Sequence, residues 1–149
     1  PDSGRVRVAD IWADRLATPL AIVHKRRDPD KPNQVQVNEI VGQVEGRDCL
    51  IVDDMIDTGG TILAAAKALK ENGAARVIVA ATHAVFSPPA SERLSDPVID
   101  AVVVTNTLPI TPDKEFENLH VLSIAPLIAK AIAAVFYDDS VNSLFPGHA

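Results

Sequence analysis

Cysteine is nearly absent from this sequence, and its scarcity limits how the fold can be stabilised. Cys49 is the only cysteine among 149 residues, so the chain cannot form an intramolecular disulfide. Chains without disulfides are typical of reducing compartments and not of secreted proteins. We therefore expect a cytoplasmic protein in which Cys49 packs as a small core side chain.

Long hydrophobic runs and an excess of basic residues are also missing. The longest apolar stretch, residues 124–137, is interrupted by Pro126 and Lys130 and is too short to span a bilayer. The first seven residues are polar and no apolar segment follows them, so no secretory signal peptide is expected. The formal net charge of −6 argues against nucleic acid as the main partner. We therefore expect no membrane and no nucleic acid partner.

The remaining composition is that of one folded domain. Hydrophobic residues make up 47% of the chain, and the mean hydropathy is +0.12. A chain of this length can bury one core, so residues 1–149 are expected to form a single domain. No internal repeat or low-complexity tract is visible.

Expected strands and helices alternate along the chain. Apolar patterning and turn residues predict helices over 3–16, 60–72, 88–94 and 126–137 and strands over 20–24, 49–52, 76–81, 99–105 and 121–124. A hairpin or edge pair is expected near 35–41, after a basic, proline-broken loop at 25–33. This order predicts an α/β fold with a mostly parallel sheet flanked by helices and a small flexible hairpin.

The most informative segment is residues 49–61, Cys-Leu-Ile-Val-Asp-Asp-Met-Ile-Asp-Thr-Gly-Gly-Thr. Its apolar start predicts a strand that is buried on both faces of a parallel sheet. The residues after it should then lie at the carboxyl end of that strand, where open α/β sheets bind ligands. Gly59 and Gly60 can take positive φ and let a phosphate approach the backbone, and the start of the following helix favours an anion.

Two adjacent acids in this segment suggest what lies beyond the phosphate. Asp53 and Asp54 can accept hydrogen bonds from two neighbouring hydroxyls or share a Mg²⁺ ion. A phosphate at one end and a diol or metal at the other describe a ribose phosphate. A turn that merely caps a helix needs one acid, not three around two glycines. A Walker A loop and a Gly-x-Gly-x-x-Gly fingerprint are both absent.

The segment resembles the phosphoribosyl diphosphate (PRPP) binding motif of type I phosphoribosyltransferases. Further segments resemble ribose-phosphate pyrophosphokinases, also called PRPP synthetases; they are residues 1–4, 24–29, 46–49, 81–83, 104–109 and 140–145. The resemblance covers essentially the whole chain. It implies that the chain corresponds to roughly the C-terminal half of such an enzyme, and the start at Pro1 without a methionine suggests a fragment.

This resemblance implies a Mg²⁺-dependent ribose-phosphate diphosphokinase. Such an enzyme transfers the pyrophosphoryl group of ATP to the C1 hydroxyl of ribose 5-phosphate, which gives PRPP and AMP. It implies that Lys25 and Arg27 are the catalytic pair on a mobile loop. Charge builds on phosphate oxygens during this transfer, and an ammonium group and a planar guanidinium can stabilise it.

The resemblance also implies roles for the remaining candidate residues. Ribose hydroxyls are assigned to Asp53 and Asp54, and the 5-phosphate to Asp57, Thr58, Gly59, Gly60 and Thr61. Asp2 is expected to help hold Mg²⁺. Members of the family assemble into dimers and hexamers, so a homo-oligomer is expected. A regulatory phosphate or ADP site is implied for Ser140, Ser143 and Phe145, although Asn142 departs from the family pattern.

Two other functions stay open at this point. A nucleobase phosphoribosyltransferase would need a base-recognition hood and a pyrophosphate loop before the motif, and neither is evident in the first 48 residues. A non-catalytic subunit associated with a synthetase would not need Lys25, Arg27 and the acidic pair. Because the N-terminal half of the family's enzymes is missing, we expect weak binding of ribose 5-phosphate and little turnover by the isolated chain.

Overall fold

The computed structural model describes residues 6–26 and 37–144. Strands, α-helices and two short 3₁₀ helices (η) follow one another as α1 (Val6–Leu16), β1 (Ile22–Arg26), β2 (Val37–Val41), β3 (Asp48–Ile56), α2 (Gly60–Glu71), β4 (Arg76–Ala84), α3 (Ala90–Leu94), β5 (Ala101–Thr105), η2 (Pro112–Lys114), β6 (Leu119–Leu122), α4 (Ala125–Phe136) and η3 (Val141–Leu144). This alternation confirms the predicted α/β class.

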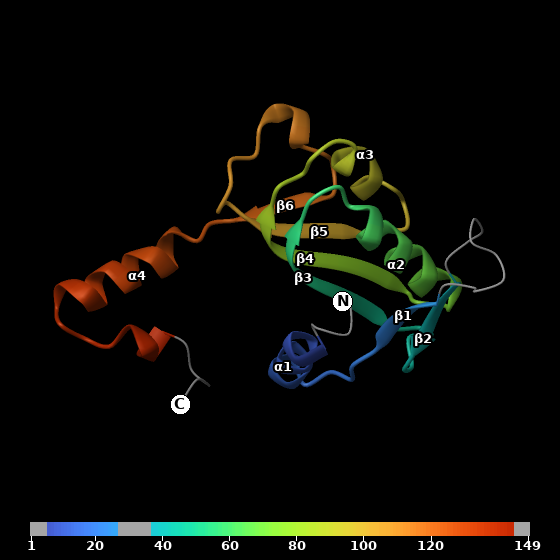
Figure 1. Cartoon of the computed structure of the whole chain (residues 1–149), viewed down its shortest axis with the longest axis horizontal. Helices are drawn as coiled ribbons and strands as arrows, with labels where there is room; N and C mark the ends of the chain where they lie inside the picture. The colour runs from blue at the N-terminus through green and yellow to red at the C-terminus, as the bar shows by residue number, and fades with distance from the viewer. Residues whose placement is uncertain (1–5, 27–36, 145–149) are drawn as a thin grey trace.

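Four strands form a parallel sheet in the order β3-β4-β5-β6 (Figure 1). Asp53 of β3 lies opposite Ala81 of β4, and Ala81 lies opposite Val104 of β5. Because all four strands run in one direction, the residues that follow each strand gather at the same edge of the sheet. A separate antiparallel pair, β1 and β2, has Ile22 opposite Val41.

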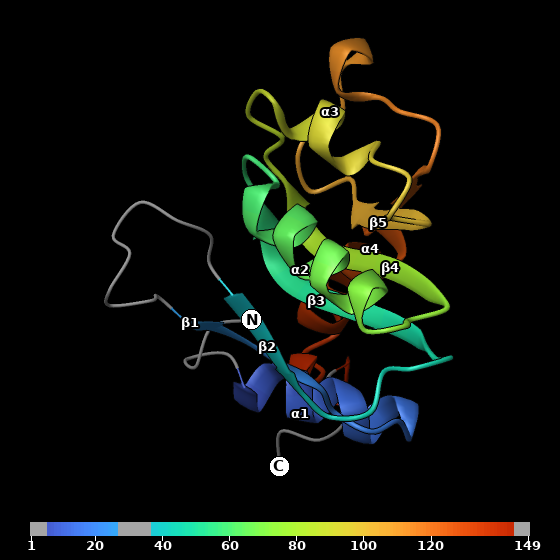
Figure 2. The same cartoon turned by 90° about the vertical axis from the view of Figure 1, so that its right-hand side faces the viewer.

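One face of the sheet is covered by α2, which lies in front of the strands in Figure 2. Ile62, Ala66 and Leu69 are buried, and their spacing places them on one side of the helix. They belong to one core with four fully buried valines of the central strands, Val77, Val79, Val102 and Val104. Burying each large apolar side chain contributes about 1.5–3 kcal/mol, so this layer holds α2 on the sheet.

The opposite face of the sheet is only partly covered, which makes one sequence prediction wrong. The strand at residues 49–52 was expected to be buried on both faces, but β3 is the edge strand of the four-stranded sheet and Leu50 is 41% exposed. Helix α1 and this face line a groove of about 530 Å³, with Trp12, Val52 and Val103 in its walls. The groove shows that α1 does not close against the sheet.

Several element boundaries also differ from the prediction. The strand expected at 49–52 continues to Ile56, so Asp53 and Asp54 lie within β3 and not after it. Strand β1 runs to Arg26, two residues into the predicted loop, because pairing with β2 extends it. Cys49 is half-buried against the core, as predicted, and burial raises the pKa of its thiol.

Helix α4 projects away from the sheet (Figure 1). It confirms the helix predicted at 126–137, but none of its residues is buried. Ile132, Val135 and Phe136 are 63%, 67% and 78% exposed. These side chains therefore add nothing to the core of the described residues. Within those residues, no helix is long and apolar enough to cross a membrane.

The amino edge of the sheet is held by paired charges. Arg76 Nε donates to Asp48 Oδ1 over 2.9 Å, and Lys70 Nζ lies 3.0 Å from Asp100 Oδ2. The backbone N–H of Val77 donates to Asp100 Oδ2 over 2.7 Å and, together with Lys70, lowers the pKa of that carboxyl. Arg76 and Lys70 are thus each matched by a carboxylate at this edge.

Candidate functional site

The structure places the predicted binding residues on one continuous segment at the carboxyl edge, from the end of β3 to the start of α2. Asp53 and Asp54 lie near the end of β3, residues 57–59 form a bend, and Gly60 and Thr61 begin α2. We call residues 57–61 the phosphate loop. The loop therefore leads from two carboxylates directly to the positive end of a twelve-residue helix.

The two glycines of this loop differ in their backbone. Gly59 has φ 70° and ψ 0°, the left-handed conformation, and is the residue that precedes α2. It has no side chain with which to cap the helix, and the first helical bond runs from Leu63 N to Gly59 O over 2.9 Å. Gly60 does not take the predicted positive φ, because it is already the first helical residue. The prediction is correct for Gly59 and wrong for Gly60.

The acidic pair lines the groove beneath α1. Asp53 is half-buried and Asp54 is exposed, and the N–H of Asp54 donates to Asp53 Oδ1 over 2.9 Å. Both residues line the 530 Å³ groove, together with Thr82 and Thr105 of the neighbouring strands. The groove thus joins an apolar floor to carboxylate and hydroxyl oxygens at the carboxyl edge.

The donor set at this edge fits Mg²⁺ only in part. No group of three histidine, cysteine, aspartate or glutamate side chains close enough to hold a metal occurs in the described ranges. Mg²⁺ is commonly bound by one or two carboxylates together with phosphate oxygens of the substrate. Asp53 and Asp54 supply such carboxylates, so they fit an ion that arrives with a phosphorylated ligand.

Helix α3 supports the phosphate loop from outside the sequence motif. Arg93 Nη1 donates to the carbonyl oxygen of Thr58 over 3.0 Å. A Cβ on Gly59 would lie 3.4 Å from Leu94 Cγ, so the glycine rests on a fully buried leucine. Sequence reasoning missed Arg93. The signal for it is topological: α3 follows β4, the neighbour of β3, and so begins at the same edge of the sheet.

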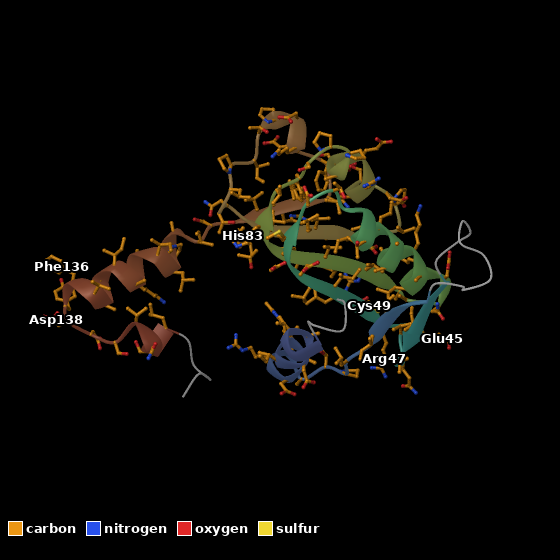
Figure 3. All side chains as sticks on the ribbon, in the orientation of Figure 1. Glu45, Arg47, Cys49, His83, Phe136 and Asp138 are labelled. Carbon is orange, nitrogen blue, oxygen red and sulfur yellow. The ribbon has the colours of Figure 1, made fainter. Side chains whose placement is uncertain are left out.

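A second polar cluster joins the ends of β4 and β5. His83 Nδ1 lies 2.9 Å from Thr107 Oγ1, and Thr105 Oγ1 donates to the carbonyl of Thr82 over 2.6 Å. Figure 3 shows His83 at the carboxyl end of the sheet, opposite the end that carries Cys49. The cluster fixes the segment after β5 against β4, which is a structural role.

The remaining predicted site residues are not assembled around this loop. Lys25 belongs to β1, where its backbone pairs with Asn38, but its side chain lies outside the description. Arg27, Asp2 and Phe145 lie outside the described residues. Their roles stay predictions.

The proposed regulatory serines lie far from the phosphate loop. Ser143 Oγ donates to the carbonyl of Ser140 over 2.7 Å, at η3 beyond the projecting α4 (Figure 1). The structure does not bring Ser140 or Ser143 to the site, so a regulatory site there stays a prediction.

Comparison with known proteins identifies consistent relatives. Residues 29–146 match a family model described as a phosphoribosyl synthetase-associated domain. A ribose-phosphate pyrophosphokinase from Streptomyces coelicolor is 61% identical over 97% of this chain, and one from Mycobacterium leprae is 57% identical over 100% of it. A crystal structure of the phosphoribosylpyrophosphate synthetase from Mycobacterium smegmatis matches 91% of the chain with a TM-score of 0.82 and 55% identity.

The chain is shorter than these relatives. It covers 45% and 46% of the two pyrophosphokinases and 43% of the solved synthetase, so it spans a little under half of their length. These matches do not confirm the predicted correspondence to the C-terminal half of the enzyme.

Gly59→Ala should separate the effect of the loop conformation on phosphate binding from its effect on the stability of the fold. Gly46 has nearly the same φ, 68°, with open space around its missing Cβ, so Gly46→Ala is a matched control. An L-residue in this conformation costs about 1–2 kcal/mol, and the alanine methyl at 59 makes only ordinary contact with Leu94. We expect similar losses of unfolding free energy in urea for both variants. Only Gly59→Ala should weaken binding of inorganic phosphate, and equal phosphate affinity for both variants would refute the loop assignment.

Proposed function

The chain belongs to the phosphoribosyl synthetase-associated domain family, and from that premise we propose that it provides the ribose 5-phosphate site of a ribose-phosphate diphosphokinase. The proposed reaction transfers the pyrophosphoryl group of ATP to the C1 hydroxyl of ribose 5-phosphate and yields PRPP and AMP. The relatives that carry this name extend over more than twice the length of the chain, so the activity belongs to the whole protein.

One arrangement supports the proposal. Gly59, with its left-handed backbone, precedes helix α2, which packs on the core, and two carboxylates lie upstream on β3. The phosphate group would accept hydrogen bonds from the N–H groups of the first turn of α2, near Gly59. The vicinal hydroxyls of the ribose would donate to Asp53 and Asp54, which line the adjoining groove. This order of groups matches a ribose phosphate better than a free anion, which has no use for the acids.

The chemistry would depend on positioning and on charge. We propose that Lys25 and Arg27 bind the phosphate oxygens of ATP as negative charge moves onto them. Arg27 would do so with two parallel N–H donors, and Lys25 as a point charge. Mg²⁺, when bound, would neutralise phosphate charge and orient the two substrates. Asp53 and Asp54 would hold the ion together with substrate oxygens, with Asp2 as a further ligand.

Asp53→Asn and Asp54→Asn should distinguish recognition of the ribose from recognition of the phosphate group. Each variant replaces a carboxylate that would accept hydrogen bonds from the ribose hydroxyls with a neutral amide. The affinity for ribose 5-phosphate should therefore fall by about tenfold or more in calorimetric titration with Mg²⁺. The affinity for inorganic phosphate should not fall, because these carboxylates do not contact it. Asp48→Asn, the same change at the amino end of β3, is the control and should bind both ligands normally. Unchanged affinity for ribose 5-phosphate in both variants would contradict the proposed site.

Lys25→Ala and Arg27→Ala should lower turnover and leave ribose 5-phosphate binding intact. In the whole protein we expect kcat for AMP formation to fall by about a hundredfold or more, because charge stabilisation in the transition state is lost. Arg26→Ala, between the two, has no assigned role and serves as the control. The isolated 149-residue chain should bind ribose 5-phosphate and form little AMP. Full turnover by the Lys25 variant would instead favour a non-catalytic subunit, and pyrophosphate release from PRPP on addition of a base would favour a phosphoribosyltransferase.

We also propose that the protein is a homo-oligomer that buries α4. Contiguous apolar surface of this kind marks interaction sites on soluble proteins, and Ile132 is 63% exposed. Ile132→Glu should reduce the mass measured by sedimentation, whereas Lys130→Glu, on the opposite side of the helix, should not. A monomeric unmutated chain would exclude self-association through α4.

A further inference from the structure

An arginine from a separate element contacts the phosphate loop. The guanidinium of Arg93, on α3, donates from Nη1 to the carbonyl of Thr58 over 3.0 Å. The same nitrogen would lie 3.3 Å from a Cβ on Gly60, so it sits beside the first residue of α2. A side chain 35 positions away in sequence therefore contacts both sides of the turn at Gly59.

The charge of Arg93 is not matched by a neighbouring acid. Within residues 6–26 and 37–144, Lys67, Lys70 and Arg76 each lie within 4 Å of a carboxylate, but no ion pair is formed by Arg93. The only hydrogen bond that its side chain makes to the described residues is the one to Thr58. A guanidinium has five N–H donors, so most of them remain available for a bound anion.

Arg93 is held in place by the packing of its own helix. Leu94, the next residue, is fully buried and lies against Gly59. Its carbonyl accepts a hydrogen bond from Asn118 Nδ2 over 3.2 Å, and the same amide donates to Ile99 O over 2.9 Å. The base of the arginine side chain is thus fixed relative to the phosphate loop before any ligand binds.

We propose that Arg93 is a positioning residue that sets both the shape and the charge of the phosphate loop. Its hydrogen bond to Thr58 holds the bend before Gly59, and its unmatched charge adds to the positive end of α2 where an anion would bind. A Cβ at Gly60 would lie 3.3 Å from Arg93 Nη1, so a side chain there would displace the guanidinium from its present position. This inference rests on the proposed function, and it assigns to the site a preference for phosphate esters over uncharged sugars.

Arg93→Met, Arg93→Lys and Arg76→Met test this role. Arg76 is the control, because it is an arginine at the amino edge whose loss changes net charge equally. In calorimetric titrations, Arg93→Met should weaken binding of ribose 5-phosphate and of inorganic phosphate by about tenfold to a hundredfold. Arg93→Lys should recover part of the affinity because it keeps the charge, and Arg76→Met should bind normally. The dependence of affinity on salt should be shallower in Arg93→Met than in the unmutated chain.

Amide hydrogen exchange supplies a readout that needs no ligand. Arg93→Met should speed exchange at residues 58–61 because the bend loses its support, and Arg76→Met should not. If the unmutated chain binds neither ligand, the proposed function fails, and unchanged exchange in Arg93→Met then overturns the positioning role as well. If the chain binds ribose 5-phosphate and Arg93→Met binds it with the same affinity and salt dependence, the role of Arg93 is refuted while the proposed function stands.

Gly60→Ala gives a geometric check on the same contact. The added methyl would approach Arg93 Nη1 to 3.3 Å, so it should weaken phosphate binding in the unmutated chain. In an Arg93→Ala background the same change should have little further effect, because nothing is left to crowd. Additive losses in the double variant would show that Gly60 acts independently of Arg93 and would contradict the proposal.

Discussion

The packing of α2 on the central strands is the interaction on which the site depends. Ile62, Ala66 and Leu69 are buried in one layer with the valines of β4 and β5, which fixes the axis of α2 and the point where it begins. The helix has to start within four residues of the end of β3, at Ile56. Gly59, with its left-handed backbone, makes the sharp turn at this point, and glycine takes this conformation without steric cost. Core packing therefore determines where the N–H groups of the first helical turn are aimed.

Periodicity and turn residues were enough to predict most elements, and the causes of the errors are physical. The apolar run at residues 49–52 was read as a doubly buried strand because the run has no alternation. Alternation is lost equally when an edge strand is exposed to a groove, as Leu50 shows. The burial of a strand depends on what covers each face of the sheet, and the local sequence of β3 does not determine how closely α1 packs on it. The continuation of β3 through Asp53 and Asp54 was missed because carboxylates are poor strand formers, whereas pairing with β4 overrides that preference.

The candidate site likewise contains residues that local sequence predicts and one that depends on the tertiary structure. Residues 53–61 could be predicted as a unit because backbone geometry, helix dipole and acidic side chains all lie on one continuous segment. Arg93 could not be predicted, because its place beside Thr58 arises from sheet order: β4 pairs with β3, and the segment after β4 crosses the same edge. A lone arginine in a five-residue helix has no local feature that sets it apart from a solvated surface residue. Only the juxtaposition of α3 and the phosphate loop brings it to Thr58.

The two edges of the sheet differ in whether their basic side chains are paired with carboxylates. At the amino edge, Arg76 and Lys70 are each paired with a carboxylate. At the carboxyl edge, the guanidinium of Arg93 forms no ion pair with any residue in the described part of the chain, and the acids of β3 lie further back along the strand. In the proposed function, anion recognition at the turn and diol recognition on β3 would therefore be separated in space. Under the proposed function, a ligand that carries both groups would satisfy both ends at once, whereas a simple anion or a neutral sugar would satisfy only one, and this difference would favour a sugar phosphate.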